Sequence, residues 1–137
     1  MFSPLRWLFP LLCCACLRGG ELAAPTVARF IRVIVFSTGG GEVACSDKEV
    51  AGELSALFVP IAKASKVVWV GSDQEVAKLG KLGKLVICGR VDLLAAGGAV
   101  AIVAEGGRPT IYVNTKNLAG SGLTLSDSVL KTCKVVK

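Results

Sequence analysis

The chain has 137 residues, the length of a single domain, and carries 16 basic against 10 acidic side chains, a formal charge of +6. Apolar residues make up 53% and charged residues 19%, which excludes a disordered chain. Histidine is absent, so the commonest general base and the commonest metal ligand are both missing. The basic residues are scattered singly and only 6% of residues are aromatic, so we expect no nucleic-acid partner.

The N-terminus has the pattern of a secretory signal peptide. Arg6 precedes an apolar run over residues 7–17, and small residues follow up to Ala24. The run is too short to span a bilayer, which needs about 20 residues. We therefore expect residues 1–24 to be a signal peptide and residues 25–137 to form one exported domain. A lipoprotein is the lesser alternative, because the residues around Cys13 and Cys14 match a lipobox only loosely.

Export leaves three cysteines in the mature chain, Cys45, Cys88 and Cys133. An odd number allows at most one internal disulfide and leaves a free thiol. Cys45 and Cys88 each end a predicted strand, and the two strands are expected to run parallel. This placement predicts a disulfide between them, provided that no third strand lies in between.

The first elements in chain order alternate between helix and strand. Residues 26–36 predict a short helix that runs into an extended segment, and residues 42–45 predict a strand after a glycine loop. Ser46-x-x-Glu49 is a capping box that opens a helix over residues 47–58. Residues 66–70 predict a second strand. Ser72-x-x-Glu75 caps a second helix, and residues 85–88 form a third strand. This alternation indicates parallel βαβ units.

The remaining elements change this pattern. Residues 99–104 and 110–113 predict a β-hairpin around Gly106-Gly107, since paired glycines supply the positive φ angles of a tight turn. Asn114 or Thr115 is expected to cap a short helix, and Ser126 to cap a last helix over residues 127–135. The predicted fold is a three-layer α/β sandwich, with a mixed sheet of parallel βαβ units followed by a C-terminal hairpin and helices.

Catalytic and cofactor sites are not supported by the sequence. The glycines do not match a phosphate-binding loop, because Gly83-Lys84 is followed by Leu85 and no G-x-G-x-x-G follows a strand. No C-x-x-C occurs in the mature chain to suggest zinc, and no histidine could activate a cysteine nucleophile. We expect neither an enzyme nor a bound cofactor or metal.

The second half of the chain resembles the YfiR family of periplasmic regulators. Five short motifs carry the resemblance. They are a Gly-Gly pair (residues 96–98), an acidic-glycine turn (105–106), a Val-Asn pair (113–114), the sequence Gly-Leu-x-Leu-Ser (122–126) and a helix that contains leucine (129–130). Residues 66–79 resemble the preceding strand and helix, and residues 28–37 resemble the end of the family's first helix. The chain resembles a shortened member, with about half of that helix.

The resemblance implies a function in signalling. Well-known members bind the periplasmic part of a membrane-bound diguanylate cyclase and so control cyclic-di-GMP signalling. The chain is therefore expected to bind such an inner-membrane partner. Our candidate contact residues are Arg29, Arg32, Tyr112 and Asn114, since tyrosine and arginine are enriched in interfaces. The alternative is a periplasmic small-molecule-binding domain that reports to a receptor or sensor. The sequence also leaves open whether the domain forms a homodimer.

Overall fold

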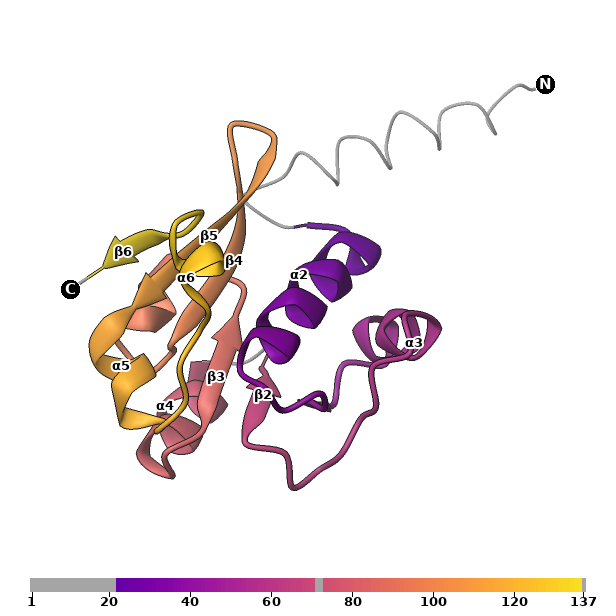
Figure 1. Cartoon of the computed structure of the whole chain (residues 1–137), viewed down its shortest axis with the longest axis horizontal. Helices are drawn as coiled ribbons and strands as arrows, with labels where there is room; N and C mark the ends of the chain where they lie inside the picture. Colours follow the sequence, from indigo (N-terminus) through magenta and orange to yellow (C-terminus); the bar gives the residue numbers. More distant parts are fainter. Residues whose placement is uncertain (1–21, 71–72, 137) are drawn as a thin grey trace.

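The computed structural model describes residues 22–70 and 73–136, which lie around one six-stranded sheet (Figure 1). The strands follow one another across the sheet in chain order. They are β1 (Ala44–Cys45), β2 (Val67–Trp69), β3 (Leu85–Cys88), β4 (Val100–Glu105), β5 (Arg108–Asn114) and β6 (Lys134–Val136). Strands β1 to β4 are parallel, β5 runs antiparallel to β4, and β6 runs parallel to β5.

Helices cover both faces of this sheet. Helices α2 (Ala24–Ser37) and α3 (Lys48–Ala56) pack on one face, and α4 (Asp73–Lys81) and the 3₁₀ helix η1 (Val91–Leu94) pack on the other. Helices α5 (Thr115–Gly120) and α6 (Asp127–Leu130) follow the hairpin (Figure 1). The predicted three-layer α/β sandwich with a mixed sheet is confirmed. Within the described residues, no helix is both long and apolar enough to cross a membrane.

Alternation along the strands divides the core into two apolar layers. Leu85 and Ile87 face α2, whereas Val86 and Cys88 face α4 and η1, and all four are fully buried. A strand covered on both faces is expected to be continuously apolar, which is why LVIC could be predicted as a buried strand. The hairpin turn is also as predicted, since Gly106 and Gly107 both have positive φ, +59° and +79°.

Helix α2 is longer than the sequence predicted. Residues 24–37 form one helix, so the extended segment expected toward Phe36 is wrong. The run from Val33 to Val35 has low intrinsic helix propensity because its side chains are β-branched. However, Ile31, Ile34 and Val35 are fully buried at helical spacing. Burial of this stripe outweighs the local preference.

Two helix boundaries also differ from the predictions. Helix α3 is capped by Asp47, whose carboxylate accepts hydrogen bonds from the amides of Glu49 (3.0 Å) and Val50 (3.2 Å), rather than by Ser46. The second predicted capping serine, Ser72, lies outside the described residues. Helix α6 ends at Leu130 instead of residue 135. The chain after it forms β6, because the outer edge of β5 offers unpaired backbone groups that a strand can satisfy.

The predicted disulfide between Cys45 and Cys88 is wrong. Strand β2 lies between β1 and β3, so the two cysteines are on strands about 9–10 Å apart, beyond the reach of a disulfide. Cys45, Cys88 and Cys133 are all free thiols. Burial raises the pKa of the Cys88 thiol to about 11, and burial also raises the pKa values of Cys45 and Cys133.

This arrangement predicts the pattern of thiol labelling. At about pH 8, a maleimide should modify the half-buried Cys45 and Cys133 in the folded protein, and Cys88 only after denaturation. Peptide mapping by mass spectrometry under non-reducing conditions gives the state of each cysteine. A Cys45–Cys88 cross-linked peptide in the purified protein would contradict the strand order.

Candidate partner-binding surface

The outward side of α2 carries both predicted arginines. Arg29, Arg32, Val33 and Phe36 are exposed, at spacings that place them on the side of the helix away from the buried stripe. Val33 and Phe36 each leave about half of their surface in solvent, 48% and 49%. The Arg32 guanidinium carbon lies 5.2 Å from the centre of the Phe36 ring, a cation–π contact. This side of α2 therefore combines positive charge with exposed apolar surface.

Helix α3 ends in a conformation that normally selects glycine. The amide of Val59 donates to the carbonyl of Leu54 (2.9 Å) and the amide of Phe58 donates to the carbonyl of Ser55 (3.0 Å), which is the Schellman pattern. Phe58 takes the left-handed position of this motif, with φ +62°, and no other non-glycine residue in the described part of the chain has a positive φ. A left-handed L-residue costs about 1–2 kcal/mol.

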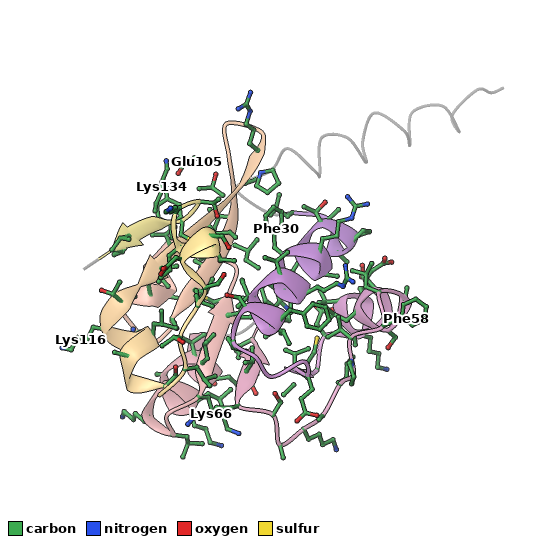
Figure 2. All side chains as sticks on the ribbon, in the orientation of Figure 1. Phe30, Phe58, Lys66, Glu105, Lys116 and Lys134 are labelled. Carbon is green, nitrogen blue, oxygen red and sulfur yellow. The ribbon has the colours of Figure 1, made fainter. Side chains whose placement is uncertain are left out.

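The side chain of Phe58 does not compensate this cost by burial, because 90% of it is exposed. Figure 2 shows Phe58 at the rim of the molecule beside α3. Ile61, three residues later, is 38% exposed. The α2–α3 face is defined here as Arg29, Arg32, Val33, Phe36, Phe58 and Ile61. It holds four of the seven large apolar side chains that are exposed in the described chain; the others, Leu82, Val91 and Val135, each lie on a different segment.

Tyr112 lies on the opposite face of the sheet from α2. It packs beside the α4 layer, and its hydroxyl donates a hydrogen bond to Glu105. Lys134 of β6 donates to the other Glu105 oxygen (2.5 Å) and lies 5.5 Å from the Tyr112 ring centre. The hydrogen bond from Lys134 lowers the pKa of the Glu105 carboxyl, and the bond to Glu105 raises the pKa of Tyr112. These three side chains tie β6 to the hairpin.

Asn114 is a structural residue and not a surface contact. Only 8% of it is exposed, and its side-chain oxygen accepts from the amide of Asn117 (3.0 Å), which caps α5. Its Nδ2 donates to the carbonyl of Leu94 (3.1 Å). The prediction of Asn114 as a partner contact is therefore wrong, because its polar groups are satisfied inside the fold.

The four predicted contact residues thus do not form one surface. Arg29 and Arg32 lie on the α2–α3 face, whereas Tyr112 lies across the sheet and Asn114 is buried. The sequence analysis missed Phe58. The sequence does contain an indication of this residue's unusual conformation. The predicted helix ends at residues 57–60 (Leu-Phe-Val-Pro) without the glycine that usually follows a helix.

Comparison with known proteins bears on the fold alone. No protein-family model and no curated protein matches the sequence. A solved structure, a conserved domain protein from Vibrio cholerae O1 biovar El Tor, matches with a TM-score of 0.56 at 11% identity, over 85% of this chain. The chain spans 61% of that protein's length. The likeness supports the α/β sandwich.

The hairpin contacts predict a pH-dependent attachment of β6. Because the pKa of Glu105 is lowered in the folded protein, the ionised carboxylate stabilises the attachment of β6. This stabilisation is fully present above the pKa that glutamate has in the unfolded chain. It is lost as the pH falls through the lower pKa of Glu105 in the folded state. Glu105→Gln should therefore speed hydrogen exchange of the β6 amides at neutral pH, measured by NMR. In the wild type, a fall in pH to below the lowered pKa of Glu105 should open β6 to the same extent, after correction for intrinsic exchange rates.

The matched control is Glu49→Gln, the same change at an exposed carboxylate on α3. If it loosens β6 as much as Glu105→Gln does, net charge and not the Glu105–Lys134 pair controls this strand.

Proposed function

We propose that this protein is an exported regulatory domain that acts by binding another protein through the α2–α3 face. The observation that supports this most directly is Phe58, a residue in a left-handed backbone conformation whose side chain is 90% exposed. Both features reduce the stability of the isolated domain. A binding role gives a reason for an aromatic side chain at a position where glycine would be more stable.

The chemistry of the face indicates the partner. Phe36 and Phe58 are large apolar side chains suited to pockets. Arg29 and Arg32 add two positive charges on the same side of α2 as Phe36. Neither arginine is in an ion pair within the described residues. The complementary surface is therefore an apolar pocket bordered by acidic residues.

The partner that we propose is the periplasmic part of an inner-membrane signalling protein, in the first place a diguanylate cyclase. This choice rests on the resemblance of residues 85–137 to the end of YfiR-family proteins, together with the export signal predicted over residues 1–24. Binding outside the membrane would then control cyclic-di-GMP synthesis inside it.

Phe58→Gly separates the two roles of this residue. The domain should become more stable by about 0.5–1 kcal/mol, since glycine removes the left-handed strain at a smaller entropic cost. Affinity for the partner should fall by about tenfold or more, the loss typical of an anchoring aromatic. Chemical denaturation measures the stability. Biolayer interferometry with the purified periplasmic domain of the cyclase encoded by the same genome measures the affinity.

Leu82→Gly is a matched control, because Leu82 is 65% exposed, follows α4 and lies outside the α2–α3 face. Its affinity should equal that of the wild type. Absence of any wild-type binding would refute the cyclase as partner. If the wild type binds and Phe58→Gly binds with the same affinity, the cyclase remains the partner but the α2–α3 face is not the binding surface.

A further inference from the structure

A concave feature lies between α4, the turn after η1, and α5, and it shares no residue with the α2–α3 face. It is a cavity of about 400 Å³ that is widely open to solvent. Its polar lining consists of three lysines, Lys81, Lys84 and Lys116, and one amide, Asn117, and the other lining residues are alanines and glycines. No carboxylate lines it.

The three lysines come from three separate segments. Lys81 is in the last turn of α4, Lys84 is just before β3, and Lys116 is in the first turn of α5. None of them is in an ion pair within the described ranges. Figure 2 shows Lys116 in the lower part of the molecule, away from the hairpin.

Fold stability does not account for this gathering of charge. A lysine at the end of α4 complements the helix dipole, but Lys116 stands at the opposite, positive end of α5, where a cation is unfavourable. Like charges on the side chains that line one hollow also repel one another. A bound anion would remove both costs.

The walls of the cavity are held in place by close packing. A Cβ on Gly80 would lie 2.9 Å from the carbonyl oxygen of Gly97, so α4 can approach this turn only through glycine. Asn117 Nδ2 donates to the carbonyls of Leu94 (2.8 Å) and Gly98 (2.9 Å), which fixes α5 against the same turn. Lys84 is itself positioned, because its Nζ donates to the carbonyl of Ser65 (3.1 Å). The hollow is thus built on both sides by specific contacts.

We infer that this cavity binds a small phosphate-bearing anion, held by Lys81, Lys84 and Lys116. Phosphate fits because its oxygens accept hydrogen bonds in several directions, and the ammonium group of each lining lysine is a charged donor. The small lining residues leave room for an organic group attached to the phosphate. The cavity shares no residue with the α2–α3 face, so this inference does not rest on the proposed partner.

Titration with pyrophosphate at low ionic strength tests the inference, with ¹⁵N–¹H NMR as the readout. Saturable shifts are expected at residues 77–84, 95–97 and 116–120. The double variant Lys81→Ala/Lys116→Ala should weaken the Kd by about tenfold or more. Both lysines are exposed, so this variant should fold, and thermal denaturation checks that it does.

The control double variant is Lys48→Ala/Lys131→Ala, which loses the same charge from exposed sites outside the cavity. It should bind pyrophosphate as the wild type does. Equal weakening in both double variants, or shifts spread over the whole surface, would overturn the inference and assign the affinity to net charge. Citrate that binds as tightly as pyrophosphate would overturn the choice of phosphate.

Discussion

The packing of α2 across the sheet is the contact on which the rest of the structure depends. Ile31, Ile34 and Val35 are fully buried, and burying each such side chain contributes about 1.5–3 kcal/mol relative to leaving it exposed. The same stripe packs against Val50 and Leu54 of α3. Because the inward side of α2 is fixed in this way, its outward side presents Arg29, Arg32, Val33 and Phe36 on a rigid support.

This dependence also explains how far the sequence could predict the fold. Strands β2 and β3 are short, continuous apolar runs between turn residues, and the Gly106-Gly107 turn defines the hairpin. These features are local, and they were predicted. Helix α2 is helical along its whole length because of tertiary contacts, which outweigh the low helix propensity of its β-branched residues. The pairing of β6 with β5 is also a tertiary contact, and the local sequence does not indicate it. The same limit applied to Cys45 and Cys88, whose separation follows from strand order alone.

The candidate surfaces were predicted only in part, for a related reason. Arg29 and Arg32 could be chosen by residue type and helical spacing, and both are exposed. Asn114 was read as a surface residue, although its side chain caps α5 and bonds to Leu94. The lysine cavity could not be found from the sequence, because Lys81 and Lys116 are 35 positions apart and meet only through the fold.

The central claim is that the protein acts through Phe36 and Phe58 and not through the hairpin. Hydroxyl-radical footprinting tests it directly, since aromatic side chains are modified in proportion to their exposure to solvent. The domain is labelled alone and in complex with the periplasmic part of the cyclase, and each aromatic residue is quantified by mass spectrometry. We predict strong protection of Phe36 and Phe58 in the complex and unchanged labelling of Tyr112. Protection of Tyr112 with Phe58 still fully labelled would contradict the account.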